Sequence, residues 1–263
     1  TTWLRVWRRQ HGDDRRRGNF GGRAFTPSRA LPLVQALLAR GADPNARITT
    51  SAMFMNYIGY PRKGAFEPFA CGTGDLRGAT PLWVAAYTAN SSSAADRASP
   101  DRATGRSEII RTLLAAGADQ HLTTDDGTTP FMVAAGLGRS TFRPREPRGI
   151  RSPSAEAAVR TLLEAGADIN AVNEADFTAL HGASFRGLNE VIAYLVDQRA
   201  DIDARDFRGR TAYRMAEGSK QSFQFQTWPD TADLLRRLGA NSRLGLPGTI
   251  QERLRDVPLA VGS

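Results

Sequence analysis

Residues 166–201 read "GADINAVNEADFTALHGASFRGLNEVIAYLVDQRAD", and the last three letters nearly repeat the first three after 33 residues. The second half of this stretch carries the apolar stripe of an amphipathic helix, formed by Val191, Ile192, Leu195 and Val196. Gly166 follows a similar stripe, at the position where a left-handed residue ends a helix at least cost. The stretch therefore predicts one unit of a repeating structure, made of a turn, a short helix and a longer helix.

The signal of a longer helix followed by a turn occurs at four other places: "LPLVQALLARGADPNAR" (31–47), "SEIIRTLLAAGADQHL" (107–122), "EAAVRTLLEAGADINAV" (156–172) and "TADLLRRLGAN" (231–241). A second signal precedes four of the longer helices: "GATPLWVAA" (78–86), "GTTPFMVAA" (127–135), "DFTALHGAS" (176–184) and "GRTAYRMAE" (209–217). Thr80 or Thr129 can cap the short helix, and Pro81 or Pro130 then takes its first position. Because one unit cannot bury its apolar face alone, neighbouring units must stack.

These residues resemble the ankyrin repeat, whose pattern runs roughly G-x-TPLHxAA…V-x-x-LL-x-x-GADxNA. The resemblance covers about residues 29–241 and implies an all-α solenoid of about five helix-turn-helix units with finger turns between them. Only the unit at 173–204 has the full pattern at the standard length. The longer spacings elsewhere predict inserted loops at 48–77, 88–105, 139–154 and 218–230. The 48–77 insertion is the most apolar, and we expect it to pack on the stack or on a partner.

The two ends are predicted to differ from the repeats. Residues 1–28 are an Arg-rich N-terminal segment in which Trp3, Leu4, Val6 and Trp7 suit a degenerate first helix of unit one. Residues 242–263 are expected to form a capping tail, where "TIQERL" has a capping box at Thr249 and Glu252.

The net charge of +8 raises the alternative of a protein that binds nucleic acid or an acidic polymer. Its candidate residues are Arg5, Arg8, Arg9, Arg15–Arg17 and Arg143–Arg151. Against it, only Lys63 and Lys220 among the 35 basic residues are lysine, which favours GC-rich coding and a bacterial source. No run of eighteen apolar residues predicts a membrane span. We expect a cytoplasmic protein, and export stays open if a signal precedes this sequence.

No catalytic, cofactor or metal motif is recognised in the sequence. His11, His121 and His181 do not cluster; His181 occupies a structural position of the repeat, and His121 takes the place of the usual Asn of a turn. "CGTGDLRG" (71–78) is interpreted as a turn, and the single Cys71 excludes an intramolecular disulfide. The sequence predicts a protein that is not an enzyme. Because it does not begin with Met, the regulatory part of a longer enzyme is a further alternative.

The resemblance implies that a protein partner binds the finger turns and the exposed side of the first helices. The matching positions are Tyr87, Asp125, Asp126, Thr128, Leu137, Glu174, Phe177, Phe185, Arg186, Phe207, Arg208 and Arg210. The three phenylalanines are the sharpest signal, because aromatic residues and arginine dominate binding hot spots. They have an alternative role, which is to pack between the fingers or beneath the 218–230 insertion. The expected function is that of a monomeric, non-catalytic scaffold for protein–protein interaction.

Overall fold

The computed structural model describes residues 27–50, 76–89, 100–138, 151–207, 209–218 and 227–245, and at 27–29 and 100–104 it describes the backbone alone. The helices in these ranges are α2 (Pro27–Ala39), α4 (Pro81–Ala89), α6 (Pro100–Ala115), α7 (Pro130–Ala134), α8 (Pro153–Glu164), α9 (Ala179–Arg186), α10 (Asn189–Asp197), α11 (Ala212–Glu217) and α12 (Pro229–Arg237). No strand is found among the described residues beyond one isolated bridge between Arg205 and Thr211. The predicted all-α class is confirmed.

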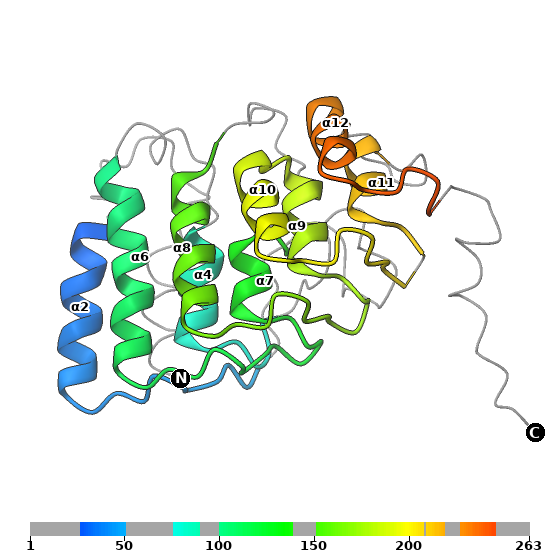
Figure 1. The fold of residues 1–263 in the computed structure, drawn as a ribbon. Coiled ribbons are helices and arrows are strands. Elements are labelled where there is room, and N and C mark those ends of the chain that lie inside the picture. The colour runs from blue at the N-terminus through cyan, green and yellow to red at the C-terminus, as the bar shows by residue number, and fades with distance from the viewer. Residues whose placement is uncertain are drawn as a thin grey trace, which may run out of the picture.

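The helices form two layers (Figure 1). The longer helices α2, α6, α8, α10 and α12 pack one against the next in one layer, and α4, α7, α9 and α11 do so in the other. Within each later unit the short helix also packs on its own longer helix, as α4 does on α6 and α9 on α10. This succession of stacked helix pairs is the predicted solenoid.

Local sequence sets where the short helices begin and where the longer ones end. The hydroxyls of Thr80, Thr129, Thr178 and Thr211 each accept a hydrogen bond from the backbone N–H three residues on, which satisfies a donor that the helix itself leaves free. The longer helices end at Gly41, Gly117, Gly166 and Gly239, all with positive φ. In unit four Arg199 takes this position with φ 72°, a conformation that costs a non-glycine residue more.

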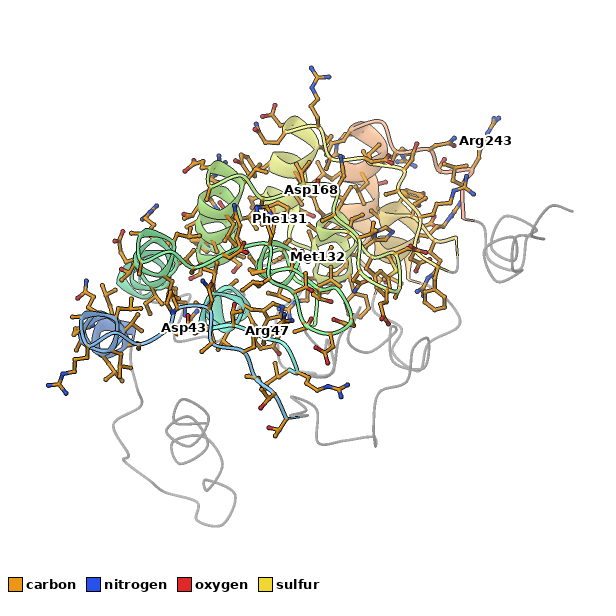
Figure 2. All side chains as sticks on the ribbon, turned by 90° about the horizontal axis from the view of Figure 1, so that it is seen from below. Asp43, Arg47, Phe131, Met132, Asp168 and Arg243 are labelled. Atoms are coloured by element: carbon orange, nitrogen blue, oxygen red, sulfur yellow. The ribbon has the colours of Figure 1, made fainter. Side chains whose placement is uncertain are left out.

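A second set of turns, which contain the GAD motifs, ties each unit to the next. A side chain in one turn bonds to the backbone of the following turn at 2.7–2.9 Å: Asn45 to Gly117 and Asp119, Asn170 to Asp201, and Asp203 to Asn241. Figure 2 shows this side of the stack from Asp43 in the first unit past Asp168 to Arg243 at the far end. Where His121 replaces the asparagine, the neighbouring Gln120 donates to the carbonyl of Ala165 instead.

Replacing His121 with asparagine should raise the free energy of unfolding by about 1 kcal/mol, the net value of one hydrogen bond. The new side chain would sit as Asn45 does and accept from the N–H of Asp168, the counterpart of Asp119. The reverse change, Asn45→His, should lower the free energy of unfolding by a similar amount. Urea unfolding midpoints of the two variants check this prediction, and a His121→Asn protein no more stable than the wild type would contradict it.

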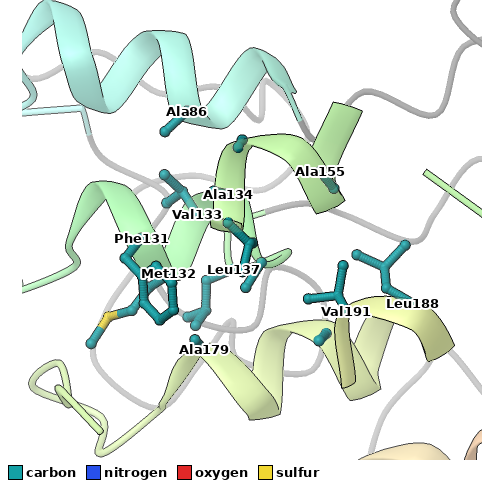
Figure 3. Packing of buried hydrophobic residues seen from close by; sticks show 14 of the residues in the cluster. Ala86, Phe131, Met132, Val133, Ala134, Leu137, Ala155, Ala179, Leu188 and Val191 are labelled. Carbon is teal, nitrogen blue, oxygen red and sulfur yellow. The ribbon is translucent and has the colours of Figure 1, made fainter. Parts of the chain in front are cut away.

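The core lies between the two layers, and α7 is at its centre. Figure 3 shows Phe131 and Val133 of α7 between Ala86 of α4 and Ala179 of α9, and all four side chains are fully buried or nearly so. After five residues α7 ends in a glycine-rich turn whose backbone touches α9. A Cβ added to Gly182 would lie 2.6 Å from the backbone nitrogen of Leu137. The two short helices therefore approach each other through their backbones.

The described helices extend into ranges where the sequence predicts loops and a terminal segment. α2 begins at Pro27, α6 at Pro100 and α8 at Pro153, and each proline stands at the start of its helix, where its missing N–H is harmless. At the two ends of the 48–77 insertion, Ile48 N–H donates to the carbonyl of Ala79 at 3.0 Å and Gly78 N–H donates to the carbonyl of Ile48 at 2.7 Å. These two bonds hold the ends of the insertion together at the first finger. The predictions for Trp3–Trp7, Cys71, His11 and the helix at 249–254 lie outside the described residues.

Candidate functional site

Each finger turn between two units is a short hairpin closed by its own backbone. The N–H of Thr124, Asn173 and Asp206 donates to the carbonyl four residues on, at 2.9–3.2 Å. The fourth residue of each hairpin has positive φ, namely Gly127, Asp176 and Gly209. The first residue also closes the turn with its side chain: Asn173 Oδ1, for example, accepts from the N–H of Ala175 and of Phe177, both at 3.0 Å. The fingers are thus rigid by local hydrogen bonding.

A ladder of backbone hydrogen bonds joins the tips of successive fingers. Its bonds run from Asp125 N–H to Arg77 O (3.0 Å), from Glu174 N–H to Asp126 O (2.9 Å) and from Phe207 N–H to Ala175 O (3.0 Å). Each finger is therefore held beside the next one in a fixed register. The tips form a continuous row along one edge of the stack.

The structure divides the predicted partner-binding residues into two groups. Asp125 and Glu174 are exposed, Asp126, Arg186 and Phe207 are half-buried, and Arg208 lies outside the described residues. The other six are buried: Tyr87, Thr128, Leu137, Phe177, Phe185 and Arg210. The expectation that these six side chains lie on an exposed strip is therefore wrong, and the alternative of internal packing is what the structure supports for the phenylalanines at 177 and 185.

The buried residues of the fingers share one position at the base of the hairpin. Thr128, Phe177 and Arg210 occupy this position in three successive fingers, with relative exposures of 0, 0 and 3%. The first helix of a unit lies directly beneath it: Trp83 Nε1 donates to the carbonyl of Thr128 at 3.0 Å, and His181 Nε2 lies 3.1 Å from the carbonyl of Arg210. In the second and fourth fingers the base is thus bonded by the first helix of the preceding unit.

His181 connects two units and has a structural position. Its Nδ1 lies 2.9 Å from the hydroxyl of Thr178 in its own helix cap, and its ring meets that of Phe177 edge to face at 5.7 Å. Arg214 stands at the same position of α11 and donates from Nε to the carbonyl of Leu244 at 2.9 Å. Side chains at this position of a short helix therefore attach it to the segment that follows in the stack. The side chain of Met132, at this position of α7, has no N–H or O–H to donate.

A residue of the 218–230 insertion binds the backbone carbonyl of Phe185. Trp228, just before α12, is buried and donates from its indole Nε1 to the carbonyl of Phe185 at 2.9 Å. Its ring lies over Gly187, where an added Cβ would come within 2.9 Å of the indole. A carbonyl at the end of α9 thus gains a partner that the helix cannot supply.

One buried ion pair lies in the last finger. Arg210 contacts the carboxylate of Asp206 through Nη2 at 2.6 Å and Nε at 2.7 Å, and Asp206 also accepts from the N–H of Arg210. The two side chains are 4 and 0% exposed. Because the carboxylate closes the hairpin and neutralises the guanidinium, this pair supports the finger and leaves no free charge there.

Two exposed features of the finger row were not predicted from the sequence. Val172, beside the third finger, is 54% exposed, unusually so for a large apolar residue. Arg77 and Asp125 form an ion pair at 3.0 Å between two neighbouring tips, with both side chains about half exposed. Position 172 aligns with Thr123 and Arg205 in the adjacent fingers. The one sequence signal that could have revealed the exposed side chain is therefore a valine at a position that is polar in the other two fingers.

The described residues offer no obvious catalytic centre. Among them, no three His, Cys, Asp or Glu side chains gather as a metal site would require. None of the described helices is long and apolar enough to cross a membrane. Among the arginines proposed for nucleic-acid binding, Arg151 lies within the described residues. Its guanidinium donates two hydrogen bonds of 2.8 Å to the carboxylate of Glu156, and these bonds raise the pKa of Arg151.

Comparison with known proteins supports the repeat assignment for part of the chain. Residues 162–216 match the family model described as ankyrin repeats (many copies). This range runs from the end of α8 into α11 and includes the third finger, the fourth finger, α9 and α10. No curated protein matches the chain.

Proposed function

We propose that this chain is a non-catalytic recognition module that binds a protein partner along its row of finger tips. The residues proposed to contact the partner are the described members of the predicted set that are not buried, namely Asp125, Asp126, Glu174, Arg186 and Phe207, together with the exposed Val172. Arg208, which lies outside the described residues, is proposed with them. Ankyrin repeats generally mediate interactions between proteins, and the family match covers the third and fourth fingers.

The observation that carries the proposal is the hydrogen-bond ladder between the tips. Because the bonds Arg77–Asp125, Asp126–Glu174 and Ala175–Phe207 fix the fingers in register, a partner meets a preordered surface and little conformational entropy is lost on binding. Glu174, at the middle of this row, has its backbone held by the ladder while the residue is exposed.

The chemistry of the row favours a protein surface over nucleic acid. Asp125, Asp126 and Glu174 place carboxylates at the tips, and Arg77 is paired with the first of them. With Arg186 and Arg208 the proposed surface carries both signs of charge beside the apolar Val172, a mixture that suits a protein partner better than the uniformly negative phosphates of nucleic acid.

Charge reversal at the middle of the row should remove partner binding without unfolding the protein. We expect Glu174→Arg to weaken binding by at least tenfold, because one hot-spot residue carries 2 kcal/mol or more. Glu164→Arg is the matched control, since it makes the same charge change at an exposed residue at the end of α8. Partner captured from nuclease-treated lysate is quantified by mass spectrometry for wild type and both variants.

Thermal unfolding should show the same melting temperature for Glu174→Arg and Glu164→Arg within about 2 °C. Equal capture by the two variants would contradict the proposed surface. Capture that disappears for all three proteins on nuclease treatment would instead favour the alternative of nucleic-acid binding.

A further inference from the structure

The connection between units four and five depends on which nitrogen of His181 carries hydrogen. The imidazole is 0% exposed. Its Nδ1 lies 3.2 Å from the backbone nitrogen of Thr178, whose N–H can only donate. Its Nε2 lies 3.1 Å from the carbonyl of Arg210 in the last finger, which can only accept. The ring is therefore neutral, with its hydrogen on Nε2.

A second proton, on Nδ1, would work against this arrangement in two ways. The hydroxyl of Thr178, 2.9 Å from Nδ1, can turn to accept the new hydrogen, but the backbone N–H of Thr178 would lose its acceptor. The positive charge would also be buried, and burial disfavours the charged form of an imidazole. The closed junction thus binds this proton more weakly than an exposed histidine does, which takes it up at about pH 6.5.

The elements around α9 provide no buried counter-ion for a charged His181. Among the described residues, Asp206 is the only buried carboxylate, and it already neutralises Arg210. Arg214 of α11 is paired with Glu217, and α7 has no charged residue. The other charged residues of the third finger, α9 and α10 are at least partly exposed: Glu174, Asp176, Arg186, Glu190 and Asp197.

The equivalent positions of the other described short helices do not change charge near neutral pH. Trp83 of α4 and Met132 of α7 have no titrating group, and Arg214 of α11 stays protonated. Histidine changes its charge between pH 5 and 8. In α7 the sulfur of Met132 accepts the N–H of the capping Thr129 at 3.5 Å, so a neutral acceptor is sufficient at this position. The titrating side chain is thus placed at the junction of units four and five.

We propose that this junction is an acid-sensitive hinge, at which protonation of His181 favours separation of unit five from unit four. Unit five, which consists of the last finger, α11 and α12, packs on α9 and α10 (Figure 1). Separation exposes the ring edge that bonds Arg210, so the open form takes up the proton. The closed form holds the neutral ring, so its advantage is complete above about pH 6.5 and is lost below it. The open population rises about tenfold from pH 7.5 to pH 5.5.

Hydrogen–deuterium exchange of the full chain tests the hinge. Protection factors, which remove the intrinsic effect of pH on exchange, should fall about tenfold for amides of residues 212–217 between pH 7.5 and pH 5.5. In His181→Gln the same amides should lose less than about twofold, because glutamine does not titrate. Glutamine can still accept the N–H of Thr178, as the third residue of a capping box does.

Two further variants make the outcome decisive. His121→Gln is the matched control, since it removes a histidine that is exposed in a turn, and it should keep the tenfold fall. His181→Met copies Met132 and replaces His181→Gln in the comparison if the glutamine variant does not fold. Equal falls in wild type and the neutral variant would overturn the proposal. Ring nitrogen resonances of His181 that titrate at about pH 6.5 in the folded protein would also overturn it, because protonation would then not be coupled to opening.

Discussion

Replacing Phe177 with alanine is expected to lower the free energy of unfolding by about 3–5 kcal/mol, the range for removing a fully buried phenylalanine. Its side chain is 0% exposed and meets the ring of His181 edge to face. His181 in turn reaches the carbonyl of Arg210 in the next finger. The cavity would therefore open where the third finger, α9 and the fourth finger meet, and the loss should appear as a lower urea midpoint by circular dichroism.

Val172→Ala is the matched control for this prediction, because Val172 lies beside the same finger, five residues from Phe177, and is 54% exposed. Its effect on the free energy of unfolding should stay within about 0.5 kcal/mol. If Phe177→Ala were as stable as Val172→Ala and yet lost partner binding, Phe177 would be a contact residue after all, and the packing described here would be wrong.

The second large effect is expected at the buried ion pair of the last finger. Asp206→Asn should lower the free energy of unfolding by about 3–5 kcal/mol, because the guanidinium of Arg210 would stay buried without its counter-charge. Arg210→Phe alone should cost a similar amount, since it leaves the carboxylate of Asp206 buried and unpaired. Urea unfolding of both single variants measures these losses.

The double variant Asp206→Asn with Arg210→Phe should recover most of that stability. It copies the third finger, where Asn173 Oδ1 accepts from the backbone N–H of Phe177 at 3.0 Å and no charge is buried. Replacing a buried ion pair by a neutral pair of similar volume is often close to neutral. Losses that simply add in the double variant would show that the two side chains do not act as a pair.

Local signals in the sequence were enough to predict the helices and their order. Thr129 caps a helix and Gly117 ends one through interactions with residues three or four positions away, so their effect is visible in a short window of sequence. The structural role of His181 was also predictable from the sequence. His181 occupies a fixed position of the repeating unit, and the contacts of that position recur from one unit to the next. The all-α solenoid follows from these repeating signals.

The burial of the finger base could not be predicted from residue type. The same position holds Thr128, Phe177 and Arg210 in successive fingers, a polar, an aromatic and a charged residue, so no pattern of polarity marks it as covered. Arg210 is tolerated there because Asp206 neutralises it, which is a property of the folded pair.

The long-range contacts made by the insertions also could not be predicted from the sequence pattern. Trp228 belongs to the 218–230 insertion, and its indole donates to the carbonyl of Phe185, 43 residues earlier in the sequence. Gly182 makes room for the turn after α7, a contact that only the three-dimensional approach of two backbones reveals. These contacts depend on how neighbouring units pack against each other. The repeat pattern in the sequence describes only a single unit and therefore cannot predict them.

The most direct test of the proposed recognition row is site-specific photo-crosslinking in nuclease-treated lysate of the source organism. A photoreactive phenylalanine analogue at position 174 should crosslink to one protein partner, and the same analogue at position 164 should not. Crosslinks at 164 and none at 174, or crosslinks to nucleic acid alone in untreated lysate, would contradict the finger row as the surface that binds a protein.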